Sequence, residues 1–157
     1  MPDSQPNDDR PRPGARRMYR HFQVLTTRWM DNDAYGHLNN VIYYSLFDTA
    51  VNAWLIEQGL LDPESSAQIG LVVESGCRFY AELGFPRPIE AGLRIARIGK
   101  SSVRYEIGLF SAGADQAAAE GFVVHVFVDR ASRRPAPLTA EMRLRFAELT
   151  VPGADNV

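Results

Sequence analysis

One long segment with helical periodicity, followed by strand-like segments almost to the end of the chain, most constrains the fold. Within residues 40–58 apolar side chains recur at three- and four-residue intervals, and Gly59 stands where a helix commonly ends. This stripe comprises Tyr43, Phe47, Ala50, Val51, Trp54 and Leu55. Because Tyr44, Leu46 and Ile56 lie off the stripe, we expect other structure to enclose most of the helix.

Strand-like segments account for most of the remaining sequence. β-branched and aromatic residues predict one strand within residues 19–29 and four more at residues 70–80, 89–98, 101–110 and 118–129. Short connections between successive strands favour antiparallel pairing. Residues 139–149 show a second, shorter helical pattern behind Thr139, a predicted N-cap. The fold class is therefore predicted to be α+β, with a curved antiparallel sheet wrapped around one long central helix.

Composition predicts the domain boundaries and the cellular compartment of the protein. Residues 1–17 are rich in Pro, Asp and Arg and are predicted to form a disordered N-terminal tail, before one domain at residues 18–150 and a C-terminal tail at 151–157. A net charge of −2 argues against a nucleic-acid partner. Because Cys77 is the single cysteine, no internal disulfide can form. With no apolar stretch for membrane insertion and no secretory signal, we expect a cytoplasmic protein.

The segment most informative about function is the loop at residues 30–40, which reads MDNDAYGHLNN. It places Asp31 and Asp33 before the N-terminus of the long helix, where unpaired N–H groups and the helix dipole favour negative charge. A carboxylate there could attack a carbonyl or activate water while the N–H groups hold the resulting oxyanion. The alternative is that these polar residues only cap the turn and the helix.

The run D-x-D-x-x-G-H-x-N-N-x-x-Y-Y from Asp31 resembles the hotdog-fold acyl-CoA thioesterases of the 4-hydroxybenzoyl-CoA thioesterase-like family. The resemblance extends over residues 19–149 and includes the segments 98–102 and 126–130, with Arg134 and Pro135 following. It implies the hotdog fold and hydrolysis of an acyl-CoA thioester to free acid and CoA. It also implies a homodimer or homotetramer, with no cofactor apart from the CoA carried by the substrate.

The resemblance also assigns roles to individual residues. Asp33 corresponds to the catalytic carboxylate, acting as nucleophile or general base, and the backbone N–H near Asn40 to the group that binds the thioester carbonyl. His37 would position the loop, and Asp31 would support it. The predicted substrate-binding residues are Asn39, Tyr43, Tyr44, Lys100, Ser101 and Ser102, of which the last three form a turn near the CoA phosphates. An ordinary hairpin turn is the alternative for that segment.

Other reactive residues are interpreted as structural. Glu74 and Arg78 share one face of a predicted strand, where a surface ion pair is favoured over a role in the pocket. His125 is predicted to lie in the core or on a sheet face, and Cys77 to pack rather than react. Since no Cys or His cluster has metal-ligand spacing, we predict no metal site.

Two other functions remain open at the level of sequence. The hotdog scaffold also serves dehydratases and hydratases, which carry an N-x-D-x-N-P-x-H-like run. Here no proline stands between Asp33 and His37, which counts against dehydration. A non-catalytic acyl-thioester binding module would be expected to lack the carboxylate that Asp33 supplies.

Overall fold

The computed structural model describes residues 10–151, which form a sheet with one long and one short α-helix. The strands are β1 (His21–Leu25), β2 (Gln68–Phe79), β3 (Ile89–Ile98), β4 (Ser102–Ser111) and β5 (Ala119–Asp129). The helices are α1 (Asn40–Glu57) and α2 (Ala140–Glu148), and two short 3-10 helices are η1 (Arg16–Met18) and η2 (Trp29–Asp31). None of the helices in this part of the chain is long and apolar enough to cross a membrane.

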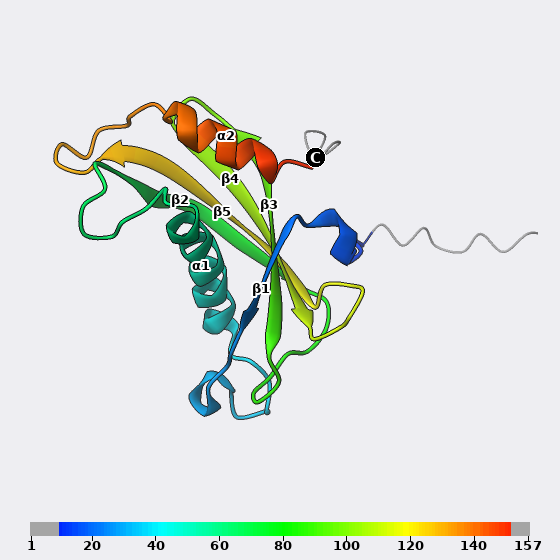
Figure 1. Ribbon diagram of the computed structural model, residues 1–157. Coiled ribbons are helices and arrows are strands. Elements are labelled where there is room, and N and C mark those ends of the chain that lie inside the picture. The colour runs from blue at the N-terminus through cyan, green and yellow to red at the C-terminus, as the bar shows by residue number, and fades with distance from the viewer. Residues whose placement is uncertain (1–9, 152–157) are drawn as a thin grey trace, which may run out of the picture.

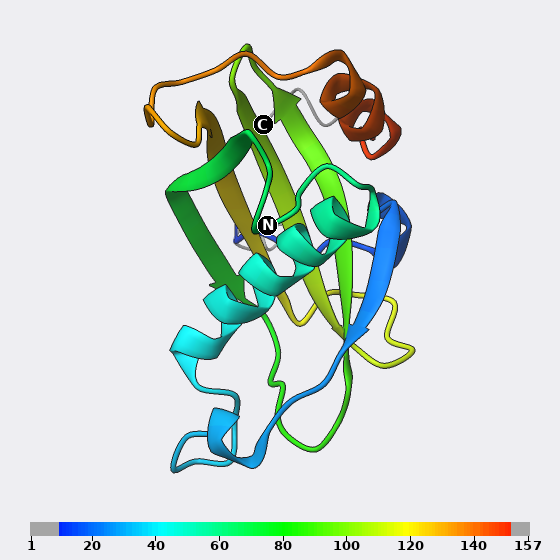
Figure 2. The same ribbon diagram turned by 60° about the vertical axis from the view of Figure 1, so that its left-hand side comes forward.

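The sheet has five strands in the order β1-β3-β4-β5-β2, and every neighbouring pair is antiparallel. The sheet is curved, and α1 lies across one of its faces (Figure 1). Turned by 60°, the molecule shows α1 running obliquely over the strands, with β1 at one edge of the sheet and β2 at the other (Figure 2). The predicted α+β arrangement is therefore confirmed.

Helix α1 packs on the sheet through the stripe expected from its periodicity. All six of its residues are buried: Tyr43, Phe47, Ala50, Val51, Trp54 and Leu55. The helix approaches β5 closely, because a Cβ atom on Gly121 would overlap the ring of Phe47. Gly121 thus lets the centre of α1 sit directly on the sheet.

The expected enclosure of α1 is only partly observed. Leu46 is buried, but Tyr44 is 39% exposed and Ile56 is 49% exposed, because the sheet covers one side of the helix and nothing in residues 10–151 covers the other. The edge strand β2 is also open, and it exposes three consecutive apolar side chains: Leu71, Val72 and Val73. The uncovered helix side and the open strand edge both leave apolar surface accessible.

Helix α2 lies over one end of the sheet and closes the core there (Figure 1). Its predicted N-cap is confirmed, because the hydroxyl of Thr139 accepts a hydrogen bond from the N–H of Met142 at 3.1 Å. Phe146 is fully buried, with ring centroids 5.8 Å from Trp54 and 6.0 Å from Tyr105. The short helix is therefore an integral part of the hydrophobic core.

The structure differs from the sequence prediction before and within the first strand. Strand β1 is shorter than the predicted segment 19–29, because Tyr19 packs outside the sheet and residues 29–31 form η2. Part of the predicted tail is docked rather than disordered. Arg16 pairs with Glu90 at 2.9 Å, and its guanidinium lies 5.0 Å and 4.9 Å from the rings of Phe22 and Phe110. Residues 1–9 and 152–157 of the predicted tails lie outside the described residues.

Candidate active site

The loop between η2 and α1 is anchored by a buried carboxylate. Asp31 accepts hydrogen bonds from the backbone N–H of Arg28 at 2.8 Å and from its guanidinium at 2.9 Å and 3.1 Å. Burial raises the pKa of Asp31, but the hydrogen bonds and positive charge of Arg28 outweigh it and hold that pKa below its ordinary value. The carbonyl of Asp31 also accepts from the N–H of Asn39 at 2.7 Å, which ties η2 to the start of α1.

Asp33 lies in a turn that fixes the direction of its carboxylate. Its Oδ1 oxygen accepts hydrogen bonds from the backbone N–H groups of Tyr35 at 2.8 Å and His37 at 3.2 Å. The turn is closed by the backbone bond from Asp33 to the carbonyl of His37, at 2.7 Å, and by Gly36 at a φ of 81°. The Oδ2 oxygen accepts no hydrogen bond from the described residues. One carboxylate oxygen is therefore oriented and the other is available.

The N-terminus of α1 presents backbone donors beside this loop. Asn39 is the N-cap, and its side chain accepts from the N–H of Val41 at 3.4 Å. The N–H of Asn40 is the first of the helix, so the helix itself offers it no acceptor. Within residues 10–151 no other group accepts from it. This N–H is therefore free to donate to a bound anion or carbonyl oxygen.

A tyrosine in the first turns of α1 connects the loop to strand β2. Burial raises the pKa of the Tyr43 phenol, the Cys77 thiol adds to this, and the carboxylates of Asp33 and Glu82 raise it further. The Tyr43 ring also lies 4.8 Å from that of Phe79. The Tyr43 ring therefore joins the first turns of α1 to the end of strand β2.

His37 has a partner that the sequence did not indicate. Its Nε2 lies 3.0 Å from the Oε2 of Glu82, in the segment that follows β2. The N–H of Leu38 donates to the carbonyl of Leu83 at 2.8 Å, and the N–H of Phe85 donates to the side chain of Asn32 at 3.0 Å. The 82–85 segment thus supports the loop before α1 from outside, beside a hollow of about 180 Å³ next to His37.

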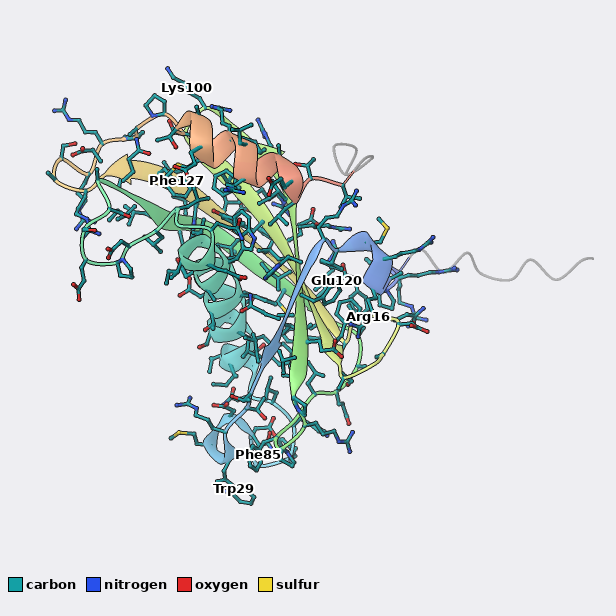
Figure 3. All side chains as sticks on the ribbon, viewed as in Figure 1. Arg16, Trp29, Phe85, Lys100, Glu120 and Phe127 are labelled. Atoms are coloured by element: carbon teal, nitrogen blue, oxygen red, sulfur yellow. The ribbon has the colours of Figure 1, made fainter. Side chains whose placement is uncertain are left out.

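The structure does not bring the predicted phosphate-binding turn to this loop within one chain. Lys100 lies at one end of the molecule, and Trp29 and Phe85, which flank the Asp33 loop, lie at the opposite end (Figure 3). The turn is well formed, because the carbonyl of Ser101 accepts from Phe127 and that of Ser102 accepts from Gly99, both at 2.7 Å. A single chain therefore holds the two halves of the predicted site far apart.

The structure places the remaining candidate residues on the sheet and on α1. Tyr44 is partly exposed on α1, and its ring packs edge-on against that of Phe47. Glu74 and Arg78 are exposed and lie on the sheet face away from α1, without the ion pair that the sequence suggested. Cys77 packs against the core, and burial raises the pKa of its thiol to about 11, as expected for a packing residue. No group of His, Cys, Asp and Glu side chains in residues 10–151 is arranged to hold a metal ion.

The geometry of this loop is suited to a reaction at a carbonyl group. Among residues 10–151, one oxygen of Asp33 has no competing donor and the first backbone N–H of α1 has no competing acceptor. A carbonyl carbon placed near Asp33 would therefore have an oxyanion donor within the same loop.

Comparison with known families identifies the chain. The model of the thioesterase-like superfamily matches residues 27–146, which include the whole loop, α1 and all strands but β1. The chain belongs to this superfamily. Thioester hydrolysis is the reaction that membership in the superfamily supports.

Solved structures of similar proteins agree with this membership. The PA5185 protein from Pseudomonas aeruginosa is 54% identical, with a TM-score of 0.86, and the match covers 90% of this chain and 99% of that one. The gentisyl-coenzyme A thioesterase BH1999 is 23% identical, with a TM-score of 0.71 over 80% of this chain and 99% of that one. The 1,4-dihydroxy-2-naphthoyl-CoA thioesterase Slr0204 from Synechocystis is 17% identical, with a TM-score of 0.72 over 83% and 98%.

These likenesses confirm the hotdog fold of the thioesterase-like superfamily for this chain. No curated protein matches the sequence. Among the residues that build the site, sequence reasoning missed Glu82, Asn32 and Arg28. Asn32 and Arg28 lie within or beside the loop motif, but Glu82 is 45 residues from His37 in the sequence, and no local pattern could have indicated the contact.

Proposed function

We propose that this protein hydrolyses an acyl-CoA thioester to a free acid and CoA, with Asp33 as the catalytic carboxylate. The observation that carries the proposal is the state of the two Asp33 oxygens. Oδ1 is held by two backbone N–H groups, while Oδ2 has no donor in the described part of the chain. A carboxylate that only capped the turn would need no particular position beside the first turns of a helix with an unused N–H.

As a nucleophile, Asp33 would attack the thioester carbonyl carbon through Oδ2. The tetrahedral oxyanion would receive a hydrogen bond from the N–H of Asn40, and the helix dipole would stabilise its charge. Cleavage of the C–S bond would then release the CoA thiolate and leave a mixed anhydride, which water hydrolyses to the acid and free Asp33. As a general base, Asp33 would instead remove a proton from the water that attacks the same carbon.

The acyl group would lie against the aromatic pair of Tyr43 and Phe79. Tyr43 is buried, but Phe79 is 49% exposed, so the wall that they form is open on one side. An apolar or aromatic acyl group would cover this exposed ring area. Two of the similar structures are named for aromatic acyl-CoA substrates, which favours an aromatic acid as the first to be tested.

A homodimer would complete the site. The open edge of β2 offers unpaired backbone groups and apolar side chains, so two copies can pair along it about a two-fold axis. Antiparallel pairing reverses the second copy, so its Lys100 end comes to the Asp33 end of the first (Figure 3). The partner copy would thereby supply Lys100, Ser101 and Ser102 for the CoA phosphates, and two dimers could associate into a tetramer.

Sedimentation at micromolar concentration tests this assembly. The wild type is expected to sediment as a dimer or tetramer, while Val72→Lys, in the middle of the open edge, should shift the protein toward monomer and reduce turnover. A stable monomeric wild type with full activity would contradict the proposed assembly.

A screen of thioesters tests the reaction. Release of free CoA thiol would be followed for acyl-CoA substrates of increasing chain length and for an aromatic acyl-CoA. The rival reaction, hydration by a hotdog-fold dehydratase or hydratase, would instead consume a 2-enoyl-CoA without releasing thiol. Thiol release from any acyl-CoA well above the uncatalysed rate supports the proposal. Hydration alone would replace it, and binding without either reaction would favour the acyl-thioester binding module.

A further inference from the structure

The sheet face opposite α1 carries a hollow of about 890 Å³. Gly121 of β5 packs against Phe47 of α1, so its neighbours Glu120 and Phe122 point to the opposite face. Both line this hollow, together with residues of β2, β3 and β4. The sheet therefore separates the hollow from α1 and from the Asp33 site.

Two arginines stand directly opposite each other on neighbouring strands in this hollow. Arg97 of β3 and Arg104 of β4 are register partners, and both line the hollow. The register of β3 shifts between Ile95 and Arg97, and a bulge of this kind redirects the side chain that follows it. Like charges opposite each other across a strand pair destabilise the sheet unless something neutralises them.

No carboxylate neutralises these arginines within residues 10–151. Arg104 stacks over the ring of Phe122, with its guanidinium carbon 3.9 Å from the ring centroid, and forms no ion pair with any described residue. Neither Arg97 nor Arg78, which also lines the hollow, has an ion-pair partner among the described residues. The neighbouring Arg94 differs, because it pairs with Glu106 at 3.0 Å.

The acidic residues of the hollow are already engaged. Glu106 is the partner of Arg94. Glu120 accepts hydrogen bonds from the phenol of Tyr19 at 2.9 Å and, at its other oxygen, from the backbone N–H of Gly14. The hollow therefore has three arginines without an ion-pair partner among residues 10–151, and both of its carboxylates, Glu106 and Glu120, already have other partners.

We propose that this hollow binds a small phosphorylated ligand, with a diphosphate between the guanidinium groups of Arg97 and Arg104. Arginine recognises phosphate oxygens through pairs of parallel N–H donors, and an anion at this position removes the repulsion between the two side chains. Arg78 supplies a further cation on the β2 side of the same hollow. The site is independent of the proposed function, since it lies on the other face of the sheet.

Two kinds of ligand could supply the diphosphate group, a free diphosphate compound or a CoA molecule. Binding of inorganic pyrophosphate by calorimetry, at constant ionic strength, tests the shared chemistry directly. CoA forms a second arm, titrated into the wild type and into Arg97→Gln/Arg104→Gln. Loss of a class of CoA sites in the double variant would identify CoA as the source, whereas unchanged CoA binding would identify a free compound.

The variants are designed to separate this site from general charge effects. Arg97→Gln/Arg104→Gln should raise the Kd for pyrophosphate at least about tenfold, in proportion to the loss of charge-assisted hydrogen bonds. Arg17→Gln/Arg20→Gln is the matched control, because it removes the same charge from two exposed arginines outside the hollow. Lys100→Gln is a second control, at the turn assigned to the substrate phosphates. Both controls should bind pyrophosphate as the wild type does.

A measurement of thermal stability checks that the double variant is folded. Without pyrophosphate its Tm should stay close to that of the wild type, because loss of the Arg104 stacking on Phe122 offsets the relieved repulsion. Pyrophosphate should raise the Tm of the wild type alone. No pyrophosphate binding by the wild type, or equal binding by the double variant, would overturn the proposal. A fall in oligomer mass in the double variant would also overturn it, since the arginines would then serve an interface between copies.

Discussion

The Nε2 of His37 lies 3.0 Å from the Oε2 of Glu82, so the loop before α1 is tied to the segment after β2. The side chains are 44% and 75% exposed, and even a charged pair this accessible contributes about 1 kcal/mol or less to stability. Glu82→Gln should therefore leave the unfolding free energy nearly unchanged in urea titrations. A several-fold fall in kcat, with KM unchanged, would be expected if the contact positions the loop, and a loss of stability above 2 kcal/mol would contradict this account.

Asp31 should matter for stability rather than for turnover. Its buried carboxylate is held by three hydrogen bonds from Arg28, and hydrogen bonds to a charged group contribute about 1–3 kcal/mol. Asp31→Asn should lose stability of that order. Because the pKa of Asp31 is lowered in the folded state, its contribution is present above the ordinary carboxyl pKa and is lost as pH falls through the folded value. The difference in unfolding free energy between the wild type and Asp31→Asn should therefore begin to shrink only below about pH 4 and disappear as pH falls through the folded-state pKa.

The docked N-terminal segment should also contribute to stability. The guanidinium of Arg16 lies over Phe22 and Phe110, and cation–π contacts of a partly buried arginine contribute about 1–2 kcal/mol. Arg16→Ala should lower the Tm, whereas Arg17→Ala, at its exposed neighbour, should not. Equal melting of the two variants would show that the contact is energetically neutral. Deletion of residues 1–17 is expected to destabilise the protein for the same reason.

His125 should make the protein less stable in mild acid. Burial lowers the pKa of His125 to about 4, and its Nδ1 has no hydrogen-bond partner in the described part of the chain. The unfolded state, with a histidine pKa of about 6.5, therefore binds more protons, so stability falls as pH falls from about 6.5 to about 4. His125→Leu should flatten the dependence of urea unfolding on pH in this window. An unchanged slope would assign the acid sensitivity to other groups.

The fold could be predicted from the sequence largely because the helical periodicity and the turn signals between strands are clear. The stripe on α1 follows from burial against a single core, so local pattern and global fold agree. The bounds of β3 were predicted to the residue, since a proline precedes it and a glycine follows it. The start of β1 was not predicted correctly, because Tyr19 belongs to a small aromatic cluster on the outer face of the sheet, and no local sequence pattern indicates that cluster.

The candidate site was only partly accessible from the sequence. The loop motif identified Asp33, His37 and Asn40 because they are close together in the chain, but it could not indicate which carboxylate was buried. Glu82 and the docking of Arg16 depend on contacts across 45 and 74 residues, which short-range patterns do not encode. The separation of Lys100 from the Asp33 loop likewise follows from the length and direction of the strands rather than from any motif.

The most direct test of the proposed mechanism is the comparison of Asp33→Asn with Asp31→Asn in steady-state hydrolysis of a good acyl-CoA substrate. Asp33→Asn keeps the size of the side chain and its acceptor oxygen but removes the charge, so the fold should survive. Its kcat should fall at least about 10²-fold, the lower end of what a positioned acid or base supplies, while Asp31→Asn should lose far less activity. Wild-type turnover by Asp33→Asn would exclude this carboxylate from the reaction.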